Sequence, residues 1–375
     1  MAIFLTGVTG FLGSTVVAHI LEHSDRDLQL LVRASDDRKA LERVWGALSW
    51  HMDGERFREV LPRLRVVRGD LHAPGLGLSK ADKTTFLDDA DSILHIAASL
   101  NRKSDKACFN TNLRGTLSVV KLGRELADRG QLERFSQVST SAVAGKRQSE
   151  VVLDDETVDW DRSDYDPYAR TKKFAEHMAS ELLPDVRRLV MRPTTVMGDS
   201  RTEVTYQTDM TLAFAGMARM PVIPLDPDLR LDFVPGDWVS RCIAKLHLLE
   251  APKHEQYNLG AGHGSTTGRK IAAALKADGR RIRFGGALGK PFDWTVRAMS
   301  RTPKGQPLRP IGAIMKVFWP YITYDTVFDN ARVVAEVGEA PAPFESYVAP
   351  MLRWSLAHDL KNPAPPPFPG SERKG

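Results

Sequence analysis

The stretch Phe4-Leu-Thr-Gly7-Val-Thr-Gly10-Phe-Leu-Gly13 decides the fold, because three glycines at a spacing of three follow a short apolar run. Gly7 and Gly10 let the backbone turn sharply and approach phosphate oxygens without a Cβ in the way, and Gly13 lets the next helix pack close to the strand. That helix directs its N-terminal N–H groups at the phosphates. The spacing differs from the commoner GxGxxG, so the strand–glycine–helix context carries the interpretation. The sequence therefore predicts a cradle for a dinucleotide pyrophosphate.

Composition and charge exclude several classes of protein. The 375 residues are 42% hydrophobic and 26% charged, which is enough for a large core. Cys108 and Cys242 lie far apart and offer neither a disulfide framework nor metal-ligand spacing, so we expect a cytoplasmic protein without a metal site. No uncharged run reaches the roughly 20 residues that span a bilayer. The net charge of +5 is spread along the chain, and no nucleic-acid partner is expected.

Apolar strands alternate with helical patterns along the first half of the chain. Strands are expected at Ile3–Thr6, Leu28–Val32, Leu64–Val67, Ser92–Ile96, Phe135–Val138 and Arg188–Met191, and helices at Asp36–Trp50, 112–127 and 167–182. This alternation predicts an α/β fold with a parallel, doubly wound (Rossmann) sheet. Leu229–Val234 and Gln256–Leu259 are expected as late strands that return to the sheet.

The domain boundaries follow from where this pattern loosens. Residues 1–195 with 229–262 are expected to form the dinucleotide-binding domain. Residues 196–228 with 263–360 are expected to form a smaller substrate-binding lid over the carboxyl edge of the sheet, where ligands bind in such folds. The proline-rich segment 361–375 is expected to be a disordered, solvated tail.

A second constellation is Asp166-Pro167-Tyr168-Ala-Arg-Thr-Lys172. Pro167 suits the first turn of a helix, which places Tyr168 and Lys172 one turn apart on the same face. A phenol with a pKa of about 10 is a weak acid at neutral pH, but a nearby cation lowers that pKa. We therefore expect Lys172 to tune Tyr168 and to be available as a ribose ligand. Taken alone, such a pair is more typical of a surface contact.

Hydroxyl side chains follow the strand that ends at Ser139, in the run Thr140-Ser141-Ala-Val-Ala-Gly145. The carboxyl end of a strand is where a substrate carbonyl would lie in such a sheet. A hydroxyl there can donate a hydrogen bond to the carbonyl oxygen. The alternative is a turn whose Ser and Thr side chains satisfy backbone groups.

These three motifs, in this order, resemble those of the extended short-chain dehydrogenase/reductase family, from residue 1 to about residue 260. The resemblance implies that Thr140, in preference to Ser139 and Ser141, is the catalytic hydroxyl. It further implies Tyr168 as proton donor and Lys172 as its partner. The cofactor-binding residues that it implies are Gly7, Thr9, Gly10, Phe11, Leu12, Gly13, Asp70, Leu71, Ala97, Asn112, Tyr168, Lys172 and Thr194.

Among these, the resemblance assigns Asp70 to the adenine, the strand end around Ala97 to the middle of the cofactor, and Asn112 to the helix that supports the active site. The alternatives are a turn aspartate, strand packing and a helix cap.

The cofactor depends on the residue that ends the second strand, about 20 positions beyond the loop, where an acid would bind the ribose 2′-hydroxyl and an arginine a 2′-phosphate. Arg33 stands there. A guanidinium binds phosphate bidentately, so NADPH is expected. Asp36 and Asp37 nearby keep NADH possible.

Within the extended family, the chain is similar to the thioester and fatty acyl reductases of the male-sterility type. The segments that carry this likeness are Thr6–Gly13 with Leu31–Val44, Arg192–Thr202 and Leu231–Val239. The likeness implies NADPH-dependent hydride transfer to the carbonyl of an acyl thioester, on coenzyme A or an acyl carrier protein, to give an aldehyde or an alcohol. It also makes a homodimer possible.

The region after residue 262 matches these reductases much less well. Because this region sets the substrate, the sequence does not identify the acyl group. Its segment Arg297–Tyr324 combines basic and bulky apolar residues. This segment could line an acyl channel, touch a membrane surface or pack as a lid helix.

Two other classes of function stay open. One is an extended-family dehydrogenase or epimerase that acts on a sterol, a ketone or a nucleotide-sugar, because the hydride machinery does not encode the substrate. The other is a non-catalytic protein that senses NAD(P). The intact set of Thr140, Tyr168 and Lys172 argues against a sensor, which needs no proton donor.

Overall fold

Seven parallel strands form the central sheet, in the order β11-β7-β5-β4-β1-β2-β3. The computed structural model describes residues 1–156, 158–205, 211, 214–215, 217–218, 222–286, 294, 298, 319–359 and 361–369. The strands are β1 (Ala2–Thr6), β2 (Asp27–Val32), β3 (Leu64–Arg68), β4 (Ala90–His95), β5 (Arg134–Val138), β7 (Arg188–Pro193) and β11 (Gln256–Leu259). The expected doubly wound α/β fold is confirmed.

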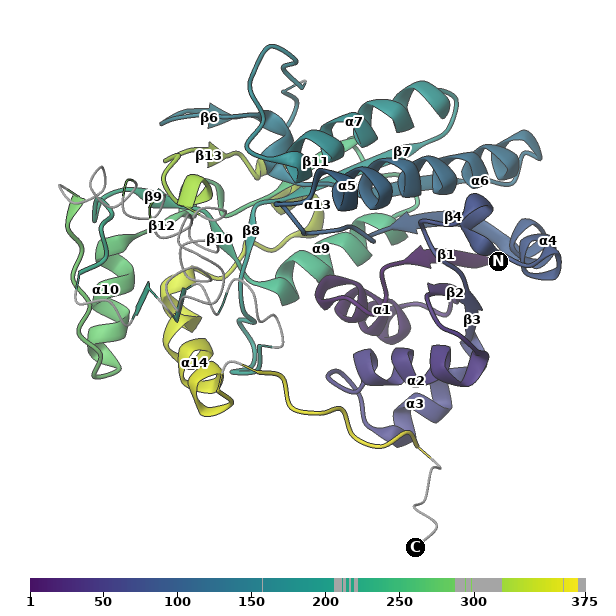
Figure 1. Cartoon of the computed structure of the whole chain (residues 1–375), viewed down its shortest axis with the longest axis horizontal. Coiled ribbons are helices and arrows are strands. Elements are labelled where there is room, and N and C mark those ends of the chain that lie inside the picture. The colour runs from purple at the N-terminus through teal and green to yellow at the C-terminus, as the bar shows by residue number, and fades with distance from the viewer. Residues whose placement is uncertain are drawn as a thin grey trace, which may run out of the picture.

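Helices cover both faces of this sheet, with α1 and α9 on one side and α6 and α7 on the other (Figure 1). Their bounds are α1 (Phe11–His23), α2 (Asp37–Leu48), α3 (Gly54–Val60), α4 (Lys80–Asp89), α5 (Asp105–Cys108), α6 (Thr116–Asp128), α7 (Pro167–Leu182) and α9 (Gly236–Leu248). On β1, Ile3 and Leu5 join the core beside α1 and α9, while Phe4 joins the core beside α6. Because both faces are covered, the strand reads as a continuous apolar run.

The segment Leu229–Val234 does not return to the central sheet, contrary to the expectation from the sequence. It forms two short strands that pair elsewhere, β9 (Arg230–Leu231) with β12 (Thr266–Thr267) and β10 (Phe233–Val234) with β8 (Thr195–Val196). Between them the Asp232 carboxylate accepts hydrogen bonds from Thr194 Oγ1 at 2.6 Å and Ala261 N at 2.9 Å. These bonds interrupt the strand and anchor it beyond the ends of β7 and β11.

The C-terminal region builds a second hydrophobic core, to which Leu231 and Phe233 contribute. Further described elements of this region are α10 (Gly268–Ala277), α13 (Ala331–Val337), α14 (Phe344–Ala357), the short 3-10 turn η7 (Trp319–Tyr321) and β13 (Val327–Phe328), which pairs with β6 (Val151–Val152) from the middle of the chain. Helices α10 and α14 pack on each other beside the sheet (Figure 1). The domain boundaries given above remain a proposal. Most of Arg297–Tyr324 lies outside the described residues.

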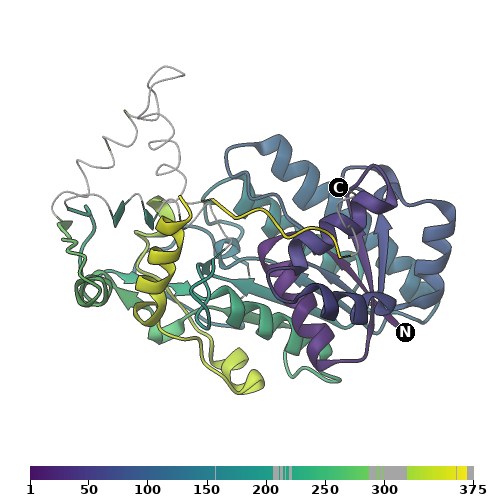
Figure 2. The same cartoon turned by 90° about the horizontal axis from the view of Figure 1, so that it is seen from below.

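The described part of the proline-rich tail lies along α2 and α3 (Figure 2), with residues 361–367 exposed to solvent as expected. Trp45 Nε1 donates to the carbonyl oxygens of Pro366 at 2.9 Å and Pro367 at 3.0 Å, and the Phe368 ring meets Phe57 edge-on. Proline has no N–H to donate, but its carbonyl oxygen still accepts, so an extended proline segment can be held by an indole. In the parts of the chain that the structure describes, we find no helix with the length and apolarity of a membrane span.

Candidate active site

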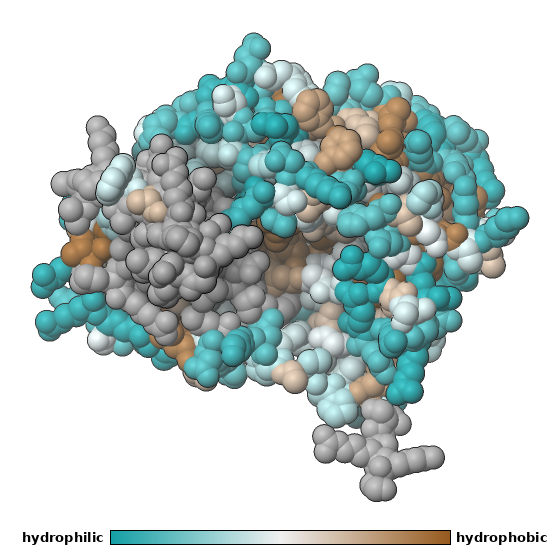
Figure 3. Space-filling model, in the orientation of Figure 1, coloured by the Kyte–Doolittle hydropathy of each residue, from teal (hydrophilic) through white to brown (hydrophobic). Residues whose placement is uncertain are grey.

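A cavity of about 780 Å³ lies along the carboxyl ends of the strands. Its walls come from the ends of β1, β2 and β5 and from the loops that follow β3, β4 and β7. The surface on this side of the molecule is hollowed and apolar within (Figure 3). The expected ligand-binding edge of the sheet therefore carries a cavity large enough for a dinucleotide and a substrate.

The glycine loop forms the floor of one part of the cavity, which Gly7, Thr9, Gly10, Phe11, Leu12 and Gly13 all line. Gly10 N donates to Gly7 O at 3.0 Å and closes the turn. Gly7 has φ +91°, and a Cβ at Gly13 would lie 2.0 Å from Gly7 O. Only glycine fits these two positions. Since the first N–H groups of a helix lack intrahelical partners, the start of α1 suits a bound anion.

Two arginines meet at the end of β2, where the side chain of one binds the backbone of the other. Arg33 and Arg43 both line the cavity, and Arg43 Nη1 donates to Arg33 O. The neighbouring acids are engaged elsewhere, because Asp36 accepts from Lys39 N at 2.8 Å as the N-cap of α2 and Asp37 pairs with Arg68. Arg43 was missed in the sequence analysis, since only the turn from β2 into α2 brings it back beside Arg33.

The other residues assigned to the cofactor fall into two groups. Asp70, Leu71, Ala97 and Thr194 line the cavity, and the Asp70 carboxylate also accepts from His72 N at 2.9 Å as in a turn. Asn112 is not among the described lining residues.

Asn112 lies behind the cavity in a π-helical turn (Phe109–Gly115) that precedes α6. Its amide bonds to Ser99 N at 2.7 Å, Ser99 O at 3.1 Å and Thr171 Oγ1 at 3.2 Å. Asn112 is fully buried and ties the loop after β4 to α7, which fits the expected role in supporting the site, and its assignment as a cofactor contact stays a prediction.

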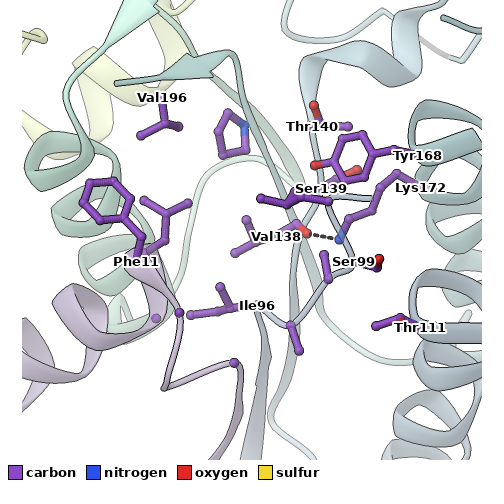
Figure 4. A pocket seen from close by; sticks show the side chains of 18 of the residues that line it. Phe11, Ile96, Ser99, Thr111, Val138, Ser139, Thr140, Tyr168, Lys172 and Val196 are labelled. Carbon is purple, nitrogen blue, oxygen red and sulfur yellow. Dashed lines mark hydrogen bonds between the residues drawn. The ribbon is translucent and has the colours of Figure 1, made fainter. Parts of the chain in front are cut away.

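Thr140, Tyr168 and Lys172 converge on the same cavity (Figure 4). Thr140 follows β5, whereas Tyr168 and Lys172 lie on α7, whose N-cap Asp166 accepts from Ala169 N at 2.9 Å. Pro167 occupies the first turn, as expected. The Thr140 hydroxyl and the Tyr168 phenol are hydrogen-bonded to each other. The strand end and the helix thus bring two hydroxyls to one point.

Among the described residues, the cation that lies over the Tyr168 ring is Arg102, whereas Lys172 was expected to tune the phenol. Lys172 Nζ donates to Val138 O at 2.8 Å (Figure 4), and burial lowers the pKa of Lys172 to about 8. The Arg102 guanidinium carbon lies 4.3 Å from the centroid of the Tyr168 ring. Burial raises the pKa of Tyr168, and Arg102 is the main influence that lowers it. Arg102 was missed because its loop carries no motif.

Aromatic side chains line the cavity beyond Tyr168. These are Tyr165, Tyr321, Tyr324 and Phe328. The Tyr165 ring lies 4.9 Å from that of Tyr321 and 6.2 Å from that of Tyr324. Since Tyr321, Tyr324 and Phe328 belong to the C-terminal region, that region helps to build the substrate side of the cavity.

His19, Glu22 and His23 lie close enough to share a metal ion at the end of α1. They do not line the cavity described above. Burial lowers the pKa of His19 to about 4, and Arg241 and Lys245 add to this effect.

Comparison with known families identifies the chain. The model of an NAD-binding family described as male sterility protein matches residues 5–243, which is more than half of the sequence. The chain belongs to this family. The part of the chain that matches the family model contains the glycine loop and also Thr140, Tyr168 and Lys172.

Relatives of this male sterility family protein include larger enzymes. A nonribosomal peptide synthetase of Aspergillus flavus is 28% identical over 269 residues, which cover 69% of this chain and 25% of that protein. A fatty acyl-CoA reductase of Drosophila melanogaster is 24% identical over 268 residues, which cover 63% of this chain and 52% of that protein. The chain therefore spans about a quarter to about a half of the length of these two curated relatives.

A solved structure shares the whole architecture. The terminal R domain from the myxalamid PKS-NRPS biosynthetic pathway matches with a TM-score of 0.81, over 96% of this chain and 91% of that one, at 24% identity. The likeness shows a common fold that extends beyond the central sheet into the C-terminal region.

Proposed function

We propose that the chain is an NADPH-dependent reductase that transfers hydride to the carbonyl carbon of an acyl thioester. The thioester would be carried on coenzyme A or on an acyl carrier protein, and the product would be an aldehyde or an alcohol. The observation that carries the proposal is that the glycine cradle and the Thr140–Tyr168 pair line one cavity. Cofactor and substrate can therefore meet there.

The residues present fit a bound NADPH. A Cβ at Gly13 would meet Gly7 O, and one at Gly7 would lie 2.7 Å from Ala97 N, so these glycines let the loop, β4 and the start of α1 pack closely at the cavity wall, where a pyrophosphate would lie. Arg33 and Arg43 supply planar cations for a 2′-phosphate, which NADH lacks. Lys172 Nζ uses one of its three N–H groups for the bond to Val138 O, and the others would serve the ribose hydroxyls. When bound, the cofactor supplies the hydride.

Side chains of the protein would bind the carbonyl oxygen of the substrate and supply the proton that it takes up. Thr140 and Tyr168 would hold the carbonyl oxygen, and Tyr168 would donate its phenolic proton as negative charge develops there. Hydride addition to a thioester carbonyl gives a hemithioacetal, whose C–S bond then breaks to release an aldehyde and a thiol. A second hydride transfer to the aldehyde would give an alcohol.

The relatives favour a thioester over other carbonyl compounds. One is a fatty acyl-CoA reductase, whose name gives a coenzyme A thioester as its substrate. The aromatic wall of Tyr165, Tyr321, Tyr324 and Phe328 suits an apolar acyl group.

Isotope transfer tests the proposal. The full chain is incubated with NADPH deuterated at the transferred position and a fatty acyl-CoA, and the product is analysed by mass spectrometry. One deuterium on the former carbonyl carbon is expected in an aldehyde and two in an alcohol. A ketone is incubated in parallel, and a deuterated alcohol from the ketone with no deuterated product from the acyl-CoA would favour the dehydrogenase alternative instead.

A further inference from the structure

Arg102 lies between two tyrosine rings in the loop that follows β4. Its guanidinium carbon is 4.3 Å from the ring centroid of Tyr168 and 4.3 Å from that of Tyr321. Nη1 donates to Asp166 Oδ2 at 3.1 Å and to the Tyr321 hydroxyl at 2.5 Å. The side chain is only 16% exposed. A buried cation is thus stacked directly on the expected proton donor.

The partners of Arg102 fix it from two further parts of the chain. The Tyr321 hydroxyl donates to Asp166 Oδ2 at 2.7 Å, and Asp166 Oδ1 caps α7 through Ala169 N at 2.9 Å. Tyr321 belongs to the C-terminal region, and Asp166 stands two residues before Tyr168. One cluster therefore joins the loop after β4, the start of α7 and the C-terminal region around a single phenol.

The charges that face Tyr168 do not act equally. Burial and the nearby Asp166 and Cys108 raise the pKa of Tyr168, while Arg102 and the hydrogen bond from Thr140 lower it. Lys172, one turn along α7, is committed to the Val138 carbonyl. Burial lowers the pKa of Arg102. The neighbouring Tyr321, Tyr168 and Asp166 raise it by more, so the guanidinium stays charged.

We propose that Arg102, clamped by Asp166 and Tyr321, is the positioning residue that holds Tyr168 in place and supplies the cation that makes it an effective proton donor. The inference rests on the proposed function, in which Tyr168 donates the proton. A cation over the face of a phenol is attracted by the ring and still more by its phenolate. The C-terminal region then contributes to catalysis through Tyr321, besides lining the cavity.

The test compares Arg102→Met, which removes the charge at similar length, with Arg102→Lys, which keeps the charge and loses the planar fork. Arg170→Met is the matched control, because Arg170 lies on the outer face of α7, pairs with Asp164 and does not line the cavity. Each full-length variant is assayed for kcat, NADPH Kd and melting temperature. Each is also labelled with difluorotyrosine, and the Tyr168 fluorine resonance, assigned by its loss in Tyr168→Phe, is followed against pH by NMR.

In Arg102→Met we expect the pH midpoint of the Tyr168 resonance to rise by about one pH unit and kcat to fall about tenfold, with NADPH Kd unchanged. In Arg102→Lys the pH midpoint should stay close to that of the wild type. Arg170→Met should match the wild type in every measurement. An unchanged midpoint in Arg102→Met overturns the proposal, whether kcat is retained or falls together with the melting temperature.

The two proposals fail separately. If the midpoint rises in Arg102→Met but the wild type reduces no acyl thioester, the role of Arg102 toward the phenol stands and the proposed substrate is wrong.

Discussion

Lys172 Nζ donates a hydrogen bond to the carbonyl oxygen of Val138 at 2.8 Å, and this bond ties α7 to the end of β5. The ammonium is buried, and its burial lowers the pKa of Lys172 to about 8. The residue that would hold the ribose therefore loses its charge at mildly alkaline pH.

The first prediction concerns that titration. Because a lowered pKa favours the neutral amine, kcat/KM for NADPH should fall as the pH rises through about 8. A series of initial rates across this range measures it. Lys172→Met should have a low kcat/KM for NADPH at every pH and no decline near pH 8. A wild-type kcat/KM that stays constant to well above pH 8 would contradict the role of Lys172 as a ribose ligand.

The second prediction contrasts two glycines of the same loop. Gly13→Ala should abolish NADPH binding and lower the melting temperature, because its Cβ would lie 2.0 Å from Gly7 O. Gly10→Ala should lower the melting temperature much less, since its Cβ would lie 3.3 Å from the same oxygen, although this Cβ too would stand near the bound phosphates. Calorimetric titration with NADPH and thermal melting decide between them. Equal melting temperatures of the two variants would contradict the close packing of Gly13 on Gly7.

The third prediction concerns the choice of cofactor. Arg33→Ala and Arg43→Ala should each raise KM for NADPH strongly and leave KM for NADH nearly unchanged, because only NADPH carries the 2′-phosphate. The control is Arg38→Ala, an exposed arginine on α2 that pairs with Glu42. A comparable rise of KM for both cofactors would show that these guanidinium groups do not bind the 2′-phosphate.

The fourth prediction concerns stability. Burial raises the pKa of Asp232 to about 6 from 3.8, while its bonds to Ala261 N and Thr194 oppose the rise. The folded state therefore binds more protons than the unfolded chain between these values, and the free energy of unfolding falls as the pH rises from about 3.8 to about 6.

Asp232→Asn should remove this loss, because an amide cannot ionise and its oxygen can keep both bonds. The variant should be more stable than the wild type by up to ~3 kcal/mol at pH values above 6, and by much less in acid. Urea unfolding at both pH values measures the difference. Asp128→Asn on the surface of α6 is the control, and a gain that is the same at both pH values would refute the explanation.

Local sequence rules account for most of the fold. Strand β1 and the glycines of its loop were predictable because their constraints are local, namely an apolar run and backbone positions that exclude a Cβ. Pro167 and the spacing of Tyr168 and Lys172 likewise place two functional side chains on one helix face. Helix α9 was missed, since Asp237 and Arg241 interrupt its apolar pattern and pair with each other at 2.8 Å inside the protein.

The rest depends on contacts between distant parts of the chain. Arg102 and Tyr321 are 219 residues apart, and nothing in either segment shows that they meet. Val138 accepts from Lys172 through its backbone, so its residue type gives no hint of the bond. The bonds that break the strand at Asp232 come from Thr194 and Ala261, which also follow other strands.

The most direct test of the central claim is a coupled assay of the purified protein with NADPH and a long-chain acyl thioester. NADPH oxidation and release of free thiol are followed in the same cuvette, with Tyr168→Phe as the control. We predict that the two signals rise together and that Tyr168→Phe, which still binds NADPH, loses roughly 10²- to 10⁴-fold in rate. Near-normal turnover by Tyr168→Phe, or no oxidation of NADPH by wild type that binds it tightly, would contradict the claim.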